Sequence, residues 1–93
     1  MGKPIPLDFV VSVVKNVAVA AIERYGYTGA TFDQLAEEVI ELHLSLRGKH
    51  EDPPALEWIS IASIAINALT LLSCDEIAVA EKTWKDRHAY EPT

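Results

Sequence analysis

Four glutamates lie in two neighbouring segments in the middle of this chain. Glu37, Glu38 and Glu41 fall on two turns of an amphipathic pattern, and Glu57 follows after a polar loop, inside an otherwise apolar run. On a helix, Glu38 and Glu41 lie about 60° apart around the axis and one turn along it, so both can contact one ion. A carboxylate among Leu, Ile and Ala costs free energy unless something compensates its charge. A divalent cation would do so, and the pattern therefore indicates a candidate cation site.

The spacing of apolar residues predicts the elements that must position these glutamates. Apolar residues recur at helical intervals over residues 7–25, where Gly26 supplies a stop, and over residues 31–48. The same periodicity predicts a third helix over residues 54–72 and a fourth over residues 75–88. Because no segment reads convincingly as a strand, we expect an all-α fold, a four-helix bundle with the glutamates on its two central helices.

Two of the predicted helix starts carry the spacing of a capping box. Thr31 is followed three residues later by Gln34, and Ser73 by Glu76. In this motif the first side chain accepts the backbone N–H of the later residue, whose side chain accepts the N–H of the first. We expect both pairs to fix where the second and fourth helices begin.

The loop over residues 48–54 is short and polar, and it ends in two prolines. A connection of this length joins neighbouring helices, typically antiparallel ones. In that arrangement Glu57, near the start of the third helix, faces Glu41 and Glu38 on the second. Three converging carboxylates repel one another unless they are protonated or bind a cation. Oxygen ligands with room for water suit Mg²⁺ or Mn²⁺.

The composition bounds the architecture. The chain has 93 residues, which predicts one domain over residues 1–93, and 49% of them are apolar. A domain this small buries only a modest core. The surplus of apolar residues therefore indicates that further copies of the chain cover part of the surface, and we expect a homo-oligomer, either a dimer or a tetramer.

The charge and the single cysteine narrow the class of protein. A formal net charge of −6 argues against nucleic acid and anionic membrane as partners, and no predicted helix offers a basic recognition face. The uncharged run over residues 58–73 is interrupted by Asn67 and hydroxyl groups and is short for a membrane span. Cys74 alone cannot form a disulfide within the chain, so we expect a reducing, cytoplasmic location.

The two acidic segments resemble those of the MazG-like, all-α nucleoside triphosphate pyrophosphohydrolases. That family carries EExxE on one helix and, after a loop, ExxD on the next. Residues 35–42, Leu-Ala-Glu-Glu-Val-Ile-Glu-Leu, match the first half of the pattern. Residues 56–62, Leu-Glu-Trp-Ile-Ser-Ile-Ala, match the second half, except that Ser60 stands where the family usually has Asp. The resemblance covers about residues 32–72 and implies a MazG-like bundle completed by oligomerisation.

The resemblance also implies a reaction and a role for each acid. The family cleaves nucleoside triphosphates between the α and β phosphates, which would make this chain a house-cleaning enzyme of the nucleotide pool. The implied cofactor, Mg²⁺ or Mn²⁺, binds the phosphates and activates a water molecule. By position, Glu38, Glu41 and Glu57 are metal ligands, and Ser60 fills the remaining ligand position. Glu37 and Glu38 are the implied catalytic acids, with Glu37 a ligand to a further ion or the base for the water.

Ser60 is the departure from the family pattern. A hydroxyl group is neutral and binds a cation more weakly than a carboxylate, so three outcomes remain open. The centre has fewer protein ligands, or the substrate differs, or catalysis is lost. In the last case the chain is a non-catalytic helical module for oligomerisation or nucleotide binding.

Five further residues are candidates for substrate binding. The cationic side chains Lys49, Lys82 and Lys85 could meet the charge of a triphosphate, although each also fits a solvated surface. Trp58 adjoins Glu57 and could stack on a base, although packing in a core or interface is the simpler explanation for it. Asn67 shares the polar sector of the third helix with Glu57, where a small polar residue also eases helix packing.

Overall fold

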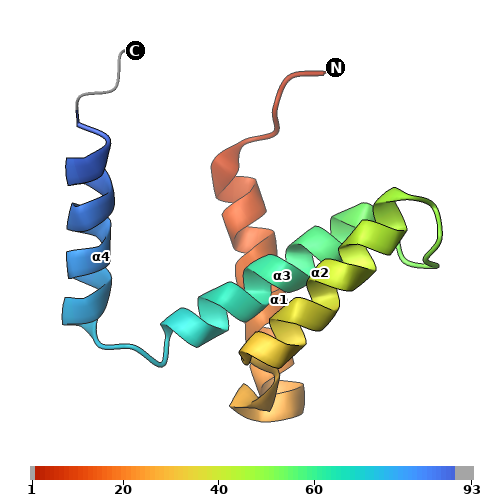
Figure 1. Ribbon diagram of the computed structural model, residues 1–93, viewed down its shortest axis with the longest axis horizontal. Helices are drawn as coiled ribbons and strands as arrows, with labels where there is room; N and C mark the ends of the chain where they lie inside the picture. The colour runs from red at the N-terminus through yellow and green to blue at the C-terminus, as the bar shows by residue number, and fades with distance from the viewer. Residues whose placement is uncertain (1, 90–93) are drawn as a thin grey trace.

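A computed structural model describes residues 2–89 of the chain and contains no strand within them (Figure 1). It has four α-helices and a short 3₁₀-helix: α1 (Leu7–Tyr25), η1 (Gly26–Gly29), α2 (Phe32–Leu46), α3 (Pro54–Leu69) and α4 (Cys74–Arg87). The expected all-α class is therefore confirmed for these residues. None of these helices is long and apolar enough to cross a membrane.

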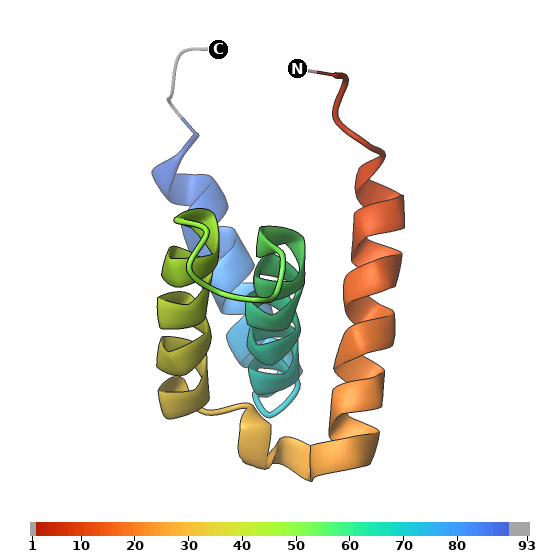
Figure 2. The ribbon, with the colours of Figure 1, turned by 90° about the vertical axis from the view of Figure 1, so that its right-hand side faces the viewer.

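The central element is α3, which packs against α2 on one side and α1 on the other. Figures 1 and 2 both show α2 and α3 side by side and running in opposite directions, joined by the loop over residues 47–53. The predicted antiparallel pair is therefore present, and it brings the start of α3 beside the second half of α2.

The chain turns sharply between α1 and α2. Gly26 ends α1 with a φ of 66°, a left-handed conformation that glycine adopts without steric cost. The 3₁₀-helix η1 follows and leads to Thr31, whose side chain accepts the backbone N–H of Gln34 at the start of α2. This turn sets α1 and α2 on opposite flanks of α3 (Figure 2).

The two expected capping boxes have different outcomes. At α4 both halves are present, since Ser73 accepts the N–H of Glu76 and the Glu76 carboxylate accepts the N–H of Ser73. At α2 only the hydroxyl half is present, because the Gln34 amide turns away and donates to Glu38. The helix bounds otherwise agree with the prediction to within about two residues, except that α3 ends three residues earlier, at Leu69.

Helix α3 buries polar side chains on one face and exposes apolar side chains on the other. Its inner face consists of the buried polar residues Glu57, Ser63 and Asn67, which look toward α1 and α2. Its outer face consists of exposed apolar residues: Trp58, Ala65, Ile66 and Leu69. Small domains normally bury the apolar side of such a helix. The buried apolar core is correspondingly small and consists of Val14, Ala18 and Leu42.

The fourth helix stands apart from the rest of the chain (Figure 1). Every residue of α4 is exposed, including the apolar Ile77, Val79 and Trp84. Within residues 2–89 it has no packed face against α1, α2 or α3. An isolated helix of this length is marginal in water, so α4 does not complete a bundle within one chain.

Candidate metal centre

The start of α3 and the second half of α2 bring three potential metal ligands together. Glu41, His50 and Glu57 each offer one ligand atom, and these atoms all lie within 4.8 Å of one another. Nδ1 of His50 lies 3.8 Å from Oε1 of Glu57. The cluster joins α2, the loop after it and α3, which are the segments that the antiparallel pairing brings together.

Glu57 is the most unusual residue of the centre. Its side chain is only 2% exposed, and its Oε2 atom is buried without a hydrogen-bond partner among the described residues. Leaving a buried polar atom unpaired costs about 1–3 kcal/mol, and more when the group is charged. The first turn of α3, where Glu57 lies, offsets part of this because helix N-termini stabilise negative charge. The oxygen nevertheless lacks a partner, and a cation would supply one.

Burial and the neighbouring carboxyls shift the pKa values of two of the three glutamates of α2, Glu38 and Glu41. Burial raises the pKa of Glu38 above its ordinary value, and the neighbouring Glu57 carboxyl raises it further, while Gln34 acts in the opposite direction. The Gln34 amide donates to Oε1 of Glu38 at 3.2 Å. Burial, followed by the charge of Glu38, also raises the pKa of Glu41. Burial is the largest cause of both shifts, and the neighbouring carboxyls add to it; a bound cation would favour the ionised forms instead.

The loop over residues 47–53 is held so that His50 lies over the cluster. The buried Ser45 hydroxyl donates to the carbonyl oxygen of Asp52 at 2.7 Å, and the Lys49 N–H donates to the Leu44 carbonyl at 2.8 Å. The Asp52 N–H in turn donates to Nδ1 of His50 at 3.2 Å. The imidazole is thus tied to the loop, and the loop to α2.

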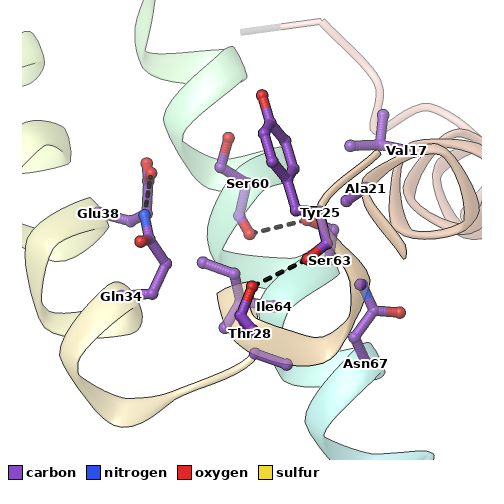
Figure 3. Close-up of a pocket in the computed structure, with 12 residues that line it drawn as sticks. Val17, Ala21, Tyr25, Thr28, Gln34, Glu38, Ser60, Ser63, Ile64 and Asn67 are labelled. Atoms are coloured by element: carbon purple, nitrogen blue, oxygen red, sulfur yellow. Dashed lines mark hydrogen bonds between the residues drawn. The ribbon is translucent and has the colours of Figure 1, made fainter. Parts of the chain in front are cut away.

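A cleft of about 530 Å³ adjoins the cluster and is lined by Glu38, whose carboxyl is a neighbour of Glu41 and Glu57. Its walls come from α1, the turn around η1, α2 and α3. Figure 3 shows Gln34 and Glu38 on one side, facing the polar residues of α3 across the opening: Ser60, Ser63 and Asn67. Val17, Ala21 and Ile64 give the cleft an apolar part, and Tyr25 stands at its edge. The volume falls within the roughly 300–1,000 Å³ of small-molecule pockets.

The structure brings three of the four predicted glutamates to one place. Glu38, Glu41 and Glu57 converge, whereas Glu37 is exposed on α2. Ser60 lines the cleft across from Glu38, and its backbone carbonyl accepts the Ser63 hydroxyl at 2.9 Å. The position that the family pattern gives to a carboxylate therefore lies at the cleft wall, next to the cluster.

The predicted substrate-binding residues are scattered. Asn67 lines the cleft, but its amide donates to the Ala18 carbonyl at 3.2 Å and so joins α3 to α1. Trp58 is 58% exposed on the outer face of α3, and Lys49 is exposed in the loop. Lys82 and Lys85 pair with Asp86 and Glu81 along α4, outside the packed helices.

Sequence reasoning missed three residues of the site. It gave His50 no role, yet the loop brings it to Glu57. The clue was its place in a short loop immediately before the helix that carries Glu57. Ser45, a lone hydroxyl among the leucines of α2, was a weaker clue to the loop anchor. Tyr25 gave no signal, since only the turn at Gly26 places it at the cleft.

Comparisons with protein-family models, with curated proteins and with solved structures found no match for this chain. Its function therefore has to be argued from the centre and the cleft themselves.

Proposed function

We propose that this chain is a divalent-cation-dependent hydrolase that cleaves nucleoside triphosphates to the monophosphate and pyrophosphate. The observation that carries the proposal is the buried Glu57, whose Oε2 lacks a partner while Glu38, Glu41 and His50 surround it. A buried carboxylate in such company is a functional-site candidate, since structural acids are normally paired.

The residues present fit a hard divalent cation. Glu41 and Glu57 offer carboxylate oxygens within 4.8 Å of each other, and Glu38 stands close enough for its pKa to respond to both of them. These three acids would hold Mg²⁺ or Mn²⁺, with Ser60 supplying at most a neutral oxygen. When bound, the cation would neutralise phosphate charge and lower the pKa of a water molecule.

The cleft supplies a place for the nucleoside. Because Glu38 lines the cleft and is a neighbour of Glu41 and Glu57, a triphosphate at the acids would extend its nucleoside between α1 and α3. Tyr25, at the rim, offers a ring on which a base can stack, and the Ser60 and Ser63 hydroxyls are the polar groups next to a sugar. Tyr25 thereby takes the role that the sequence suggested for Trp58.

Glu37 remains the candidate base for the attacking water. It lies on α2 beside Glu38, is exposed, and is near enough to Glu41 for its charge to raise that residue's pKa. Its place on α2 beside the metal ligands is what a base for the attacking water requires.

The exposed apolar surface supports a homo-oligomer as the working form. The outer face of α3 and the apolar residues of α4 are large and uncovered within one chain. Exposed apolar areas of this extent mark interaction sites. A second copy that covers them would also give α4, with Lys82 and Lys85, a surface on which to pack.

A non-catalytic nucleotide-binding module is the second candidate, and Ser60 is the observation that favours it. With a serine at the cleft wall, the cluster has one carboxylate fewer than the family pattern supplies. Such a module would bind nucleotide in the cleft and release no pyrophosphate.

Pyrophosphate release tests the choice directly. A panel of ribo- and deoxynucleoside triphosphates is incubated with the chain in Mg²⁺ and in Mn²⁺, and pyrophosphate and monophosphate are quantified together. We expect release that Glu57→Gln lowers at least about 100-fold, since even residues that only support metal ligands contribute 10–100-fold. Glu23→Gln, an exposed acid on α1, is the matched control. Nucleotide binding without turnover, in all cations, would favour the module, and a gain of turnover in Ser60→Asp would identify a weakened enzyme.

A further inference from the structure

We propose that His50 is a nitrogen ligand of the cation centre and gives it a preference for a transition-metal ion, such as Mn²⁺ or Co²⁺, over Mg²⁺. The assignment rests on the proposed function because His50 shares the centre with Glu41 and Glu57. It goes further in naming a ligand that the EExxE and ExxD pattern does not contain.

The first support is the position of the imidazole. One ring nitrogen of His50 lies within 4.8 Å of carboxylate oxygens from both Glu41 and Glu57, and Nδ1 is 3.8 Å from Oε1 of Glu57. Ligand atoms around an ion bonded at about 2.1 Å lie roughly 3 Å from one another when adjacent. The His50–Glu57 pair at 3.8 Å would have to close by about 1 Å, and a pair at the 4.8 Å limit by about 2 Å, for the three atoms to share one ion.

The second support is the unpaired oxygen of Glu57. Oε2 is buried and has no hydrogen-bond partner among residues 2–89, although the other oxygen of the same carboxylate faces His50. An acidic cluster alone would not indicate a ligand, since exposed carboxylates are common. A fully buried carboxylate with one oxygen left over does indicate one, because that atom lost its water on folding.

The third support is the way in which the loop holds the ring. The backbone N–H of Asp52 donates to Nδ1, so this nitrogen carries its lone pair and no proton, and ligation through Nδ1 would replace this hydrogen bond with a bond to the cation. The Asp52 carboxylate lies 3.9 Å from the same nitrogen. The partner that usually orients a ligating histidine lies on its other ring nitrogen, so this carboxylate does not take that role, and the backbone bond from Asp52 is what fixes the ring here.

The same geometry also suits a different role, in which a protonated His50 is the counter-charge of Glu57. The two roles predict opposite effects. As a ligand, His50 adds affinity for metals that accept imidazole, and it adds little for Mg²⁺, which prefers oxygen. As a counter-charge, it competes with every cation, so its removal would strengthen the binding of Mn²⁺ and Mg²⁺ alike.

Metal binding by the full chain, without nucleotide, separates these roles. Mn²⁺ affinity is measured from the paramagnetic resonance of free Mn²⁺, and Mg²⁺ affinity by competition, for the wild type, His50→Gln and His43→Gln. His43 is an exposed histidine of α2 and serves as the control. We expect His50→Gln to weaken Mn²⁺ at least about tenfold and Mg²⁺ less than about twofold, with His43→Gln unchanged.

A spectroscopic readout on the wild type avoids dependence on the variant's fold. Electron spin-echo modulation of bound Mn²⁺ should show coupling to ¹⁴N, and this should change to the ¹⁵N pattern when histidine alone is ¹⁵N-labelled. Mn²⁺ binding without nitrogen coupling, or equal or tighter Mn²⁺ binding by His50→Gln, would overturn the assignment and leave the hydrolase intact. Nitrogen coupling without nucleotide cleavage would support His50 as a metal ligand and contradict the proposed hydrolase activity. If no divalent cation binds at millimolar concentration, both the His50 assignment and the proposed hydrolase activity are wrong.

Discussion

A helix in an ordinary small domain has an apolar inner face and a polar outer face. In α3 the inner face is polar and the outer face is apolar. The inner face buries Glu57, Ser63 and Asn67 between neighbouring helices, while the outer face leaves Trp58 and Leu69 in water. Burying polar groups and exposing apolar ones both oppose folding. Under the proposed function, the inner face would bind ligands and a second copy of the chain would cover the outer face.

The largest expected effect comes from Glu57, which defines the inner face. Glu57→Gln keeps the side-chain shape and removes the buried charge, so in the absence of divalent cations we expect the free energy of unfolding to rise by about 1–3 kcal/mol. The same variant should lose the cation-induced stabilisation of the wild type, which is about 2.7 kcal/mol at a hundredfold excess of cation over its Kd. Thermal unfolding with EDTA and with Mn²⁺ measures both.

One result for Glu57→Gln would contradict the need for a cation. A variant that is less stable than the wild type in EDTA would show that the carboxylate is satisfied by the protein itself. The centre would then have no need of a cation, and the inner face would be an ordinary polar packing surface.

The next effect concerns Asn67, where the inner face serves packing more than ligand binding. Asn67→Ala removes the bond from its amide to the Ala18 carbonyl and leaves a small void between α1 and α3. We expect a loss of about 1–2 kcal/mol in the free energy of unfolding by urea. Metal affinity should be unchanged, and nucleotide KM should rise only if Asn67 also touches substrate in the cleft.

A substitution on the outer face of α3 should change the stability less, but it should change the oligomeric state. Leu69 is 49% exposed in the single chain, so Leu69→Glu should alter the stability of a monomer by no more than about 0.5 kcal/mol. If a second copy covers the outer face, the same substitution should lower the mass measured by light scattering to that of one chain. Ala65→Ser, on the same face, is the conservative control. An unchanged mass with unchanged stability would show that the outer face is uncovered.

The helices could be predicted from the sequence more completely than the site, and the reasons are physical. Periodicity, Gly26 and the cap at Ser73 act within a few residues, so they predicted the helix bounds and, through the short loop, the antiparallel pair. The convergence of Glu38, Glu41 and Glu57 follows from that pairing. The position of His50 does not, because it depends on the bond from Ser45 to Asp52, which is a tertiary contact of an irregular loop. Likewise, no local signal indicates that α4 leaves the other helices.

The smallest expected effect is a dependence of stability on pH, and it concerns the two glutamates of α2, Glu38 and Glu41, that lie next to the inner face of α3. The pKa values of Glu38 and Glu41 are raised above their ordinary 4.5 in the folded chain. The folded state therefore binds protons more readily than the unfolded state, and stability rises as pH falls from neutrality toward that ordinary value. It is lost again as pH rises through the raised pKa values. We expect the melting temperature in EDTA to follow this trend, and saturating Mn²⁺ to remove it, because the bound cation keeps the carboxylates ionised. The chain as a whole is acidic, so the repulsion among its other charges also changes with pH. The double variant Glu38→Gln, Glu41→Gln isolates the contribution of these two residues. If the melting temperature of that variant depends on pH as the wild type does, the dependence comes from the rest of the surface.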